Sequence, residues 1–429
     1  MRILWLKSDL LLPLDKGGRL RTWHLMRHLA RRHEITYLSF SEPGQEHAIE
    51  GMREVAAEVV TVPRRDPAKR SLLFYMDAAR YMADPLPYAV AKYRSTAYRS
   101  KLTALLRDRR FDLIVCDFLV PAVNLPKSLP CPAAIFTHNV EAEIWRRHAE
   151  TKSSVPARWL YRLQHQRMLR FEEDTLQRFD GVLAVSDADR ETFARLYPAA
   201  AHKPAWVVRT GVDTEYFVPQ NSENPENPAN LVFTGSMDWL PNEDAMKYFC
   251  HDVLPLIREQ APGVTLSIVG RAPTPAVRAL ADGDRITVTG TVDDVRPYIG
   301  KAAVYVVPLR IGGGTRLKIF EAMAMAKAVV STAVGAEGLP VVAGEHALIA
   351  DDPRAFADAV LALLRDPARR GALEAAARSL VVEHYDWSAV AGELDDALRM
   401  TARQASRAPR THRPRRASGA AKGRRRASA

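Results

Sequence analysis

Residues 308–332 read PLRIGGGTRLKIFEAMAMAKAVVST, and this stretch decides the fold class. The apolar run 303–307 before it is typical of a buried parallel strand, and a second such run follows at 328–331. A strand, a glycine-rich turn and a helix start together form a phosphate-binding arrangement, because glycines admit close backbone approach and helix-end N–H groups donate to an anion. The segment therefore predicts an α/β fold with a phosphate site at Gly312, Gly313, Gly314 and Thr315.

A carboxylate lies in the first turns of the helix that follows these glycines. Glu321 would repel a phosphate there, so a neutral hydroxyl such as that of a ribose suits it better. The combination of a phosphate turn and a hydroxyl acceptor predicts a ligand that carries both a diphosphate and a sugar, as a nucleotide does.

Apolar strands alternate with helices along almost the whole chain, which indicates helices layered on parallel sheets. A polar segment, PQNSENPENP at 219–228, interrupts this alternation and predicts a linker between two doubly wound units. We expect domains at 1–217 and 229–385, a helix at 386–402 and a disordered basic tail at 403–429. The last strand of the first domain is expected at 207–209.

Composition and charge limit the classes of protein to be considered. The chain has 429 residues, of which 47% are hydrophobic, so each domain can form a core without disulfides. Three dispersed cysteines indicate buried, reduced thiols, and no zinc motif accompanies them. We expect a cytoplasmic protein, because the sequence shows neither the pattern of a secretory signal nor an apolar run long enough to span a membrane.

The positive charge is concentrated at the C-terminus. Residues 401–429 contain ten Arg or Lys and no acidic residue, and subtracting these ten from the net charge of +11 leaves +1 for the rest. Such a tail can be solvated, or can bind nucleic acid or an anionic membrane. Because the body is nearly neutral, a nucleic-acid function for the whole protein is not favoured.

Polar groups and glycines follow several of the expected strands, at the edge where ligands of parallel sheets bind. Gly17 and Gly18 open the first helix, where a glycine pair is either a plain turn or a second anion site. His138 follows the strand 133–136, and it can bind a substrate hydroxyl or cap the next helix. Gly235, Arg271 and Gly290 follow strands of the second half, and we expect them, with Gly17 and Gly18, to contact the ligand that carries the diphosphate and the sugar.

Taken together, these residues resemble the GT-B glycosyltransferases, specifically retaining family 4. The resemblance is carried by LSIVGR at 266–271, ITVTGTVDD at 286–294, AVYVVP at 303–308, FEAMA at 320–324 and, in the first half, by Gly17-Gly18, THN at 137–139 and RTGVD at 209–213. More narrowly, the chain is similar to the sugar transferases of bacterial exopolysaccharide and exosortase systems. The resemblance spans about 1–400 and excludes the tail.

The resemblance implies two facing Rossmann-like domains, the first binding an acceptor and the second a nucleotide-sugar donor. It also implies transfer with retention of configuration and no metal or other cofactor, since cations and helix ends carry the diphosphate charge. Two family features differ here. Gly313 replaces the first of two paired glutamates, of which Glu321 is the second, and Ser236 and Asn242 occupy the region where the family has an Arg and a Lys.

A departing diphosphate still needs positive charge, and the sequence offers a replacement. Arg316 and Lys318, with Arg310, lie close to the glycine turn, so we expect them to stabilise the leaving group. The alternative is that one of them points to solvent on the helix.

The expected acceptor is a glycan or a polyprenyl-linked glycan. Segments 92–110 and 146–170 are basic and carry interleaved aromatic residues, including Tyr93, Tyr98 and Trp159. They can rest on an anionic membrane surface or be ordinary solvated helix faces.

Two other functions remain open from the sequence. A nucleotide-sugar epimerase can share this fold, and it would form product without an acceptor. A noncatalytic sugar-nucleotide-binding subunit is suggested by the missing carboxylate at Gly313.

Overall fold

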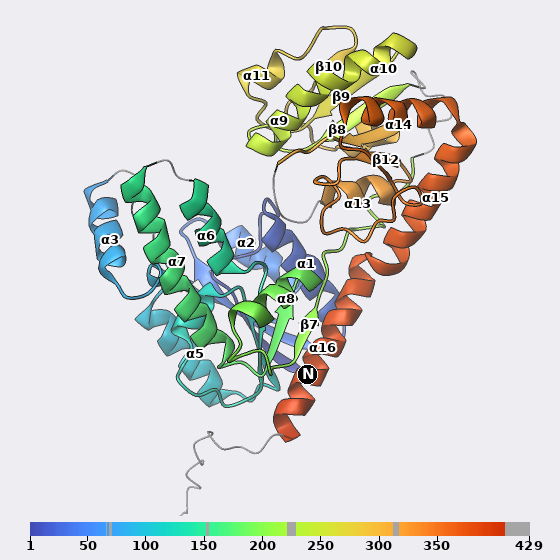
Figure 1. Cartoon of the computed structure of the whole chain (residues 1–429). Helices are drawn as coiled ribbons and strands as arrows, with labels where there is room; N and C mark the ends of the chain where they lie inside the picture. Colours follow the sequence, from blue (N-terminus) through green and yellow to red (C-terminus); the bar gives the residue numbers. More distant parts are fainter. Residues whose placement is uncertain (66, 68–70, 152–153, 221–228, 312–316, 408–429) are drawn as a thin grey trace, which may run out of the picture.

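The computed structural model describes residues 1–65, 67, 71–151, 154–220, 229–311 and 317–407. Two α/β units are stacked in Figure 1, the N-terminal one below and the C-terminal one above, and each is built around its own sheet. The predicted class of two doubly wound parallel sheets is therefore confirmed. The glycine turn at 312–316, including Gly312, Gly313, Gly314, Thr315 and Arg316, and the tail beyond 407 lie outside the described residues.

The N-terminal sheet has seven parallel strands in the order β3-β2-β1-β4-β5-β6-β7. Their bounds are β1 Arg2–Leu6, β2 Glu34–Ser41, β3 Glu58–Pro63, β4 Leu113–Asp117, β5 Ala133–Phe136, β6 Gly181–Ala184 and β7 Ala205–Val207. The helices of this unit are α1 Gly17–Leu29, α2 Glu46–Gly51, α3 Leu72–Ala83, α4 Tyr88–Ala91, α5 Thr96–Asp108, α6 Glu141–Thr151, α7 Val155–Leu176 and α8 Asp187–Leu196.

The C-terminal sheet has six parallel strands in the order β10-β9-β8-β11-β12-β13. Their bounds are β8 Asn230–Thr234, β9 Thr265–Val269, β10 Ile286–Val288, β11 Val304–Val307, β12 Ala328–Ser331 and β13 Leu348–Ile349. The helices that follow are α9 Leu240–Tyr248, α10 Leu254–Gln260, α11 Pro275–Arg278, α12 Arg296–Gly300, α13 Leu317–Ala324, α14 Pro353–Arg365, α15 Pro367–His384 and α16 Trp387–Arg407.

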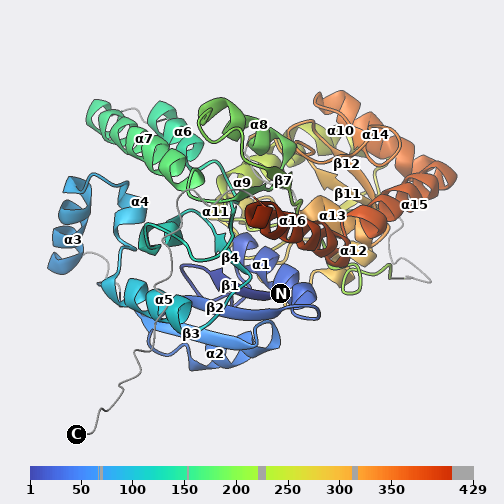
Figure 2. The same ribbon diagram turned by 90° about the horizontal axis from the view of Figure 1, so that it is seen from below.

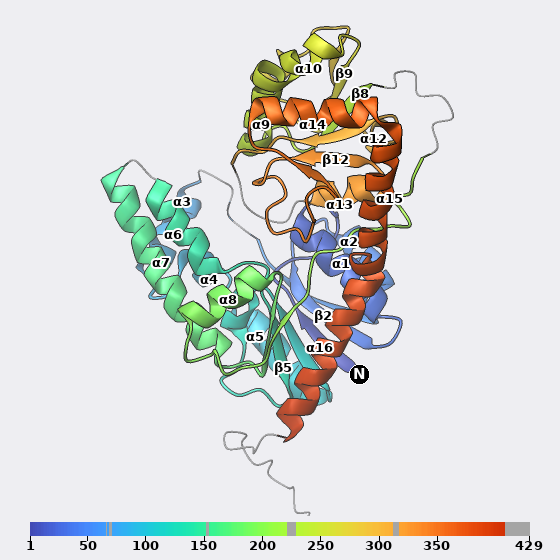
Figure 3. The same ribbon diagram turned by 45° about the vertical axis from the view of Figure 1, so that its right-hand side comes forward.

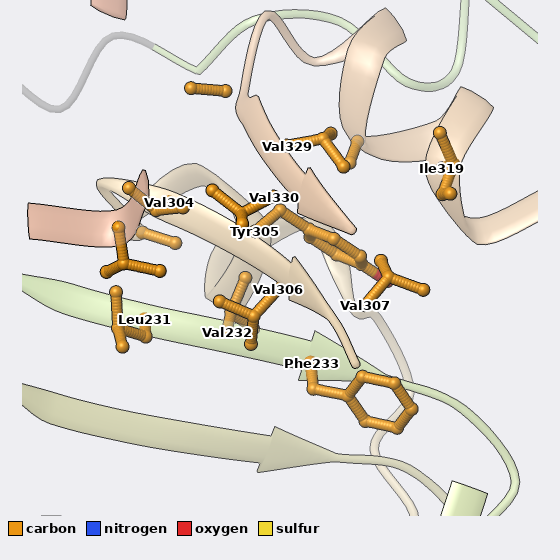
Figure 4. Close-up of a cluster of buried hydrophobic side chains, with 14 of the residues drawn as sticks. Leu231, Val232, Phe233, Val304, Tyr305, Val306, Val307, Ile319, Val329 and Val330 are labelled. Atoms are coloured by element: carbon orange, nitrogen blue, oxygen red, sulfur yellow. The ribbon is translucent and has the colours of Figure 1, made fainter. Parts of the chain in front are cut away.

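Both sheets reverse their strand order at one place, between β1 and β4 and between β8 and β11. Ligands of open parallel sheets bind beyond the carboxyl ends of the strands at such a reversal. The cores keep these strands in place: Leu4 and Leu6 face one side of the N-terminal sheet, whereas Ile3 and Trp5 face the other. Figure 4 shows the equivalent packing in the C-terminal unit, with valines of β8, β11 and β12 interleaved around Tyr305.

The final helix returns to the N-terminal unit. α15 and α16 run as a long arm beside both units in Figures 1 and 3, and the view from below shows α16 lying across the N-terminal unit (Figure 2). Trp387 and Leu394 of α16 join the core that contains Ile3 and Trp5, and Trp387 stacks on His24 of α1 with ring centroids 5.2 Å apart. The C-terminal helix thus ties the two ends of the chain together.

Three expectations from the sequence are wrong in detail. The helix expected to end at residue 402 continues to Arg407, so the first five residues of the expected disordered tail are helical. The strand expected at 207–209 lies at Ala205–Val207, because it is an edge strand whose pairing with β6 fixes its bounds more than its own apolar pattern does. Tyr98, expected among exposed aromatic residues, is fully buried, and its hydroxyl donates to the carbonyl of Leu38. It belongs to the core, so only its basic neighbours are available to a partner.

Candidate active site

A buried polar cluster lies at the strand reversal of the N-terminal sheet. Lys7 follows β1, Asp117 ends β4, and His138 lies two residues after β5. Lys7 Nζ donates to Asp117 Oδ2 over 2.8 Å, and Thr22 of α1 donates to the same oxygen over 2.7 Å. The indole nitrogen of Trp5 also donates to it, over 3.0 Å. Burial alone would raise the pKa of Asp117, but the charge of Lys7 and the hydrogen bonds from Lys7 and His138 hold it below its usual range. This carboxylate is therefore ionised.

His138 is held inside this cluster. Its Nε2 lies 2.7 Å from Asp117 Oδ1, and its Nδ1 lies 3.3 Å from Nη1 of Arg21. The carboxylate requires the proton on Nε2, which leaves Nδ1 to accept from the guanidinium. Burial, with Lys7 and Arg21 nearby, lowers the pKa of His138 to about 4, so the ring is neutral at pH 7. A substrate contact by His138 stays a prediction, and both ring nitrogens already have protein partners.

The Gly17-Gly18 start of α1 lies beside this histidine. The helix has no side-chain cap and no acidic residue in its first turn. A Cβ on Gly18 would come within 2.8 Å of Cζ of Phe118, so any larger residue there would displace the Phe118 ring. The Phe118 ring in turn stacks on His138, with centroids 3.9 Å apart and planes 3° from parallel.

The C-terminal sheet places a cation at its own strand reversal. Lys318 of α13 donates through Nζ to Asn242 Oδ1 over 3.0 Å, and this nitrogen lies 4.0 Å from the centroid of the Phe233 ring. A Cβ on Gly235 would meet Lys318 Nζ at 2.8 Å and Asn242 Nδ2 at 2.7 Å. The lysine from α13 therefore reaches the turn after β8, where the resemblance led us to expect an Arg and a Lys. Lys318 faces this turn, which argues against the alternative that it points to solvent.

Glu321 follows Lys318 by one turn on α13 and is half-buried. Burial raises the pKa of its carboxyl to about 7, and the charge of Lys318 opposes this rise. Near neutral pH the group can therefore accept a hydrogen bond from a hydroxyl when ionised, or donate one when protonated.

The other predicted residues take separate positions. Arg271 donates through Nε to Ser236 Oγ over 2.8 Å, so it lies at the same turn as Gly235. Gly290 has a φ of +74°, and no described residue has an atom within 4 Å of the position that a Cβ would take there. Arg310 pairs with Asp244, with Nη2 and Oδ1 2.6 Å apart, and lies over the Tyr248 ring. This pairing occupies Arg310 and weakens its expected role beside the diphosphate.

Sequence reasoning missed three residues of the N-terminal cluster, namely Lys7, Arg21 and Asp117. Lys7 and Asp117 follow or end the strands that flank the reversal, so the rule applied to His138 also identifies them once the strand order is known. Arg21 carries no comparable signal, because one cation on an amphipathic helix is ordinarily a solvated residue. Ser186 caps the N-terminus of α8 by accepting from the Asp189 N–H over 3.1 Å.

Two family models match the chain. The model described as Glycosyltransferase Family 4 matches residues 16–216, and the model described as Glycosyl transferases group 1 matches residues 228–366. These two matches cover the two α/β units and divide at the linker.

Individual relatives agree with these models. The chain is 22% identical over 402 residues to an uncharacterized 44.6 kDa protein of the cps region of Klebsiella pneumoniae, covering 90% of this chain and 96% of that protein. It is 34% identical over 225 residues to the phosphatidyl-myo-inositol mannosyltransferase of Mycobacterium leprae, covering 50% of this chain but only 57% of the enzyme.

A solved structure shares the fold of the whole described body. The Anabaena protein HepE in complex with UDP superposes with a TM-score of 0.66 and 15% identity, covering 93% of this chain and all of that one. A sucrose-phosphate synthase from Thermosynechococcus elongatus superposes with a TM-score of 0.64 and 18% identity, covering 93% and 98% of the two chains. At these identities the likeness supports the fold, and the site must be argued from its residues.

Proposed function

Because this chain belongs to the glycosyltransferases of family 4, with the GT-B fold, we propose that it transfers a sugar from a nucleotide-sugar donor to a glycan or lipid-linked glycan, with retention of configuration. One observation carries the proposal: Lys318 Nζ donates to Asn242 and lies beside Gly235 at the strand reversal of the C-terminal sheet. A cation beside a close backbone turn suits the diphosphate of such a donor.

The roles of the two units follow from the residues at their sheet edges. In the C-terminal unit, Lys318 offers positive charge to a leaving diphosphate, and Glu321 offers a carboxyl to a ribose hydroxyl. Preorganised cations stabilise charge that develops as the leaving group departs, which is the largest single contribution to many such reactions. In the N-terminal unit, the cluster around His138 and the N-terminus of α1, which lacks a side-chain cap, offer hydrogen-bonding groups to the acceptor and to the transferred sugar.

Known proteins support the choice of donor. HepE has been solved in complex with UDP and with UDP-glucose, and a relative from Mycobacterium tuberculosis is a GDP-mannose-dependent mannosyltransferase. We therefore propose that this chain uses a nucleotide-sugar donor, and we do not assign its nucleobase. The cps-region relative supports a role in cell-surface polysaccharide or exopolysaccharide synthesis.

We also propose that the reaction needs no metal or other cofactor, because Lys318 and Arg271 can supply charge that a metal would otherwise provide. Turnover measured with and without a chelator tests this, and loss of activity that Mg²⁺ or Mn²⁺ restores would contradict it.

An acceptor carried on a lipid predicts a protein on the cytoplasmic face of a membrane. Within the described ranges, none of the helices is both long enough and apolar enough to span a bilayer. Peripheral docking is instead supported by exposed apolar side chains at the starts of α3 and α7, which Figures 1 and 3 place at the same end of the N-terminal unit. Leu72 is 77% exposed and Trp159 is 65% exposed. Exposed arginines of α7, including Arg162 and Arg170, supply charge for anionic headgroups.

The deciding experiment is to incubate the protein with a panel of nucleotide sugars, with and without candidate lipid-linked acceptors, and to follow nucleotide release and product. Acceptor-dependent release of nucleoside diphosphate supports the transferase. Conversion of the donor sugar without any acceptor would indicate the epimerase instead. Ligand-induced thermal stabilisation with no turnover on any acceptor would indicate a binding subunit. Retention follows from comparing the anomeric configuration of donor and product by NMR.

A further inference from the structure

Arg21 is a buried cation that forms no ion pair with the part of the chain that the structure describes. Its side chain comes from α1 and the residue is 8% exposed. Its Nε has no hydrogen-bond partner among the described residues, and its Nη1 contacts the neutral His138 over 3.3 Å. Burial lowers the pKa of Arg21 to about 10, and the more distant Asp117 and Asp189 oppose this, so the guanidinium keeps its charge at pH 7.

An unpaired buried charge lowers the stability of the folded protein. Buried charges are normally paired, and an uncompensated one destabilises the fold. Asp117 does not pair with Arg21, because its two oxygens are already engaged by Lys7, Thr22, Trp5 and His138. Among the described residues, Arg21 forms no ion pair with a carboxylate. The cluster around His138 therefore keeps an unbalanced positive charge and an unused N–H donor.

The surroundings of Arg21 are also those of an anion site. Gly18, three residues earlier on α1, opens a helix whose first turn lacks a side-chain cap, so its N–H groups add to the positive potential. Phe118, between Gly18 and His138, has a φ of 71° although it is not glycine. Such backbone strain is costly and concentrates at ligand-binding positions. All of these groups lie at the strand reversal of the N-terminal sheet.

We propose that Arg21 binds a phosphate oxygen of a substrate, with Nε and an Nη donating to it beside the start of α1. This assignment rests on the proposed function, which supplies two sources of phosphate: the diphosphate of the nucleotide-sugar donor and the phosphate of a lipid-linked acceptor. The guanidinium fork is suited to either, because it makes two parallel hydrogen bonds to one phosphate group.

The test compares the full-length wild type with Arg21→Gln and Arg21→Lys by isothermal titration calorimetry. One arm titrates UDP, GDP, ADP and dTDP, and the other titrates farnesyl phosphate as a short lipid phosphate. Arg27→Gln is the matched control, since Arg27 lies on the same helix with a half-exposed side chain and a surface carboxylate, Glu54, 3.7 Å away. We expect Arg21→Gln to weaken binding at least tenfold in one arm or both, Arg21→Lys to weaken it less, and Arg27→Gln to leave it unchanged.

Thermal unfolding of the same variants without ligand separates binding from structure. Removing an unpaired buried charge should leave Tm of Arg21→Gln equal to or above that of the wild type, while affinity falls. Loss in the nucleotide arm assigns Arg21 to the donor, and loss in the farnesyl phosphate arm assigns it to the acceptor. Wild-type affinity retained by Arg21→Gln in both arms, or a large fall in its Tm, would overturn the assignment while leaving the proposed function intact. Binding of no compound by the wild type would contradict the proposed function itself.

Discussion

Lys318 Nζ donates a 3.0 Å hydrogen bond to Oδ1 of Asn242, and this bond joins α13 to α9 across the end of β8. The two residues are 76 positions apart in sequence. They place a cation at a turn that lacks one of its own, since Gly235 and Ser236 lead directly into Met237. The charge comes from a neighbouring helix, and the amide of Asn242 fixes the direction of the lysine side chain.

Replacing Lys318 should therefore slow the chemical step more than it weakens donor binding. For Lys318→Ala we expect kcat to fall by about 10²–10³, because a cation that stabilises the leaving diphosphate acts mainly in the transition state. Arg316→Ala tests the second cation predicted from the sequence. Steady-state kinetics with varied donor measure both effects, and Lys247→Gln, on the surface of α9 and paired with Glu243, is the control. Near-normal turnover in both alanine variants would show that the leaving-group assignment is wrong.

Glu321 should make stability depend on pH in a direction opposite to that of a salt-bridged carboxylate. Its pKa is about 7 in the folded protein, above the ordinary value of 4.5. The folded state therefore binds the proton more tightly, so the stabilisation is complete below about pH 4.5 and is lost as pH rises through 7. Glu321→Gln removes this dependence.

Urea unfolding of wild type and Glu321→Gln at pH 5, 6, 7 and 8 measures the effect. We expect the variant to gain on the wild type by about 1–3 kcal/mol between the lowest and the highest pH. Glu172, whose pKa burial also raises to about 7, is present in both proteins, so its contribution cancels in the difference. A constant difference between the two proteins across this range would contradict the raised pKa of Glu321.

The Lys7–Asp117 pair should be needed for folding of the N-terminal unit. Asp117 is fully buried and Lys7 is 1% exposed, so Asp117→Asn leaves a buried ammonium group without its counter-ion. Breaking a buried pair in this way typically costs about 3–5 kcal/mol. The double variant Lys7→Met/Asp117→Asn should recover part of that loss, since the buried ammonium group of Lys7 is then absent as well. Urea unfolding measures both, with Asp108→Asn as the exposed control, expected to cost under about 0.5 kcal/mol. Equal stability of Asp117→Asn and the wild type would contradict the pairing.

Much of the fold follows from local sequence patterns, whereas the site follows only in part. Apolar strands such as 133–136 and 304–307 are buried on both faces, so their own composition defines them. The edge strand β7 is half exposed, and its bounds depend on pairing with β6.

The same contrast applies to the site. His138 and Gly235 were identifiable because each lies within two residues of the end of a strand. The partnership of Lys318 with Asn242 and the isolation of Arg21 depend on which helices pack together, and no local pattern encodes that packing. The burial that raises the pKa of Glu321 is likewise a tertiary effect.

The exposed apolar residues of the N-terminal unit predict binding to anionic membranes. Trp159, 65% exposed, lies in the second turn of α7, and Leu72, 77% exposed, is the first residue of α3. Aromatic and aliphatic side chains at such positions insert into the headgroup region. The double variant Leu72→Ser/Trp159→Ser should pellet several-fold less with vesicles that contain 30% anionic lipid, and its Tm should change little. The chain should be ended after Arg407 in this assay, so that the basic tail does not contribute. Val382→Ser, on α15 at 40% exposure, is the control. Two outcomes would contradict docking through α3 and α7. One is that the shortened wild-type chain does not bind the vesicles, and the other is that the double variant binds them as well as the shortened wild type does.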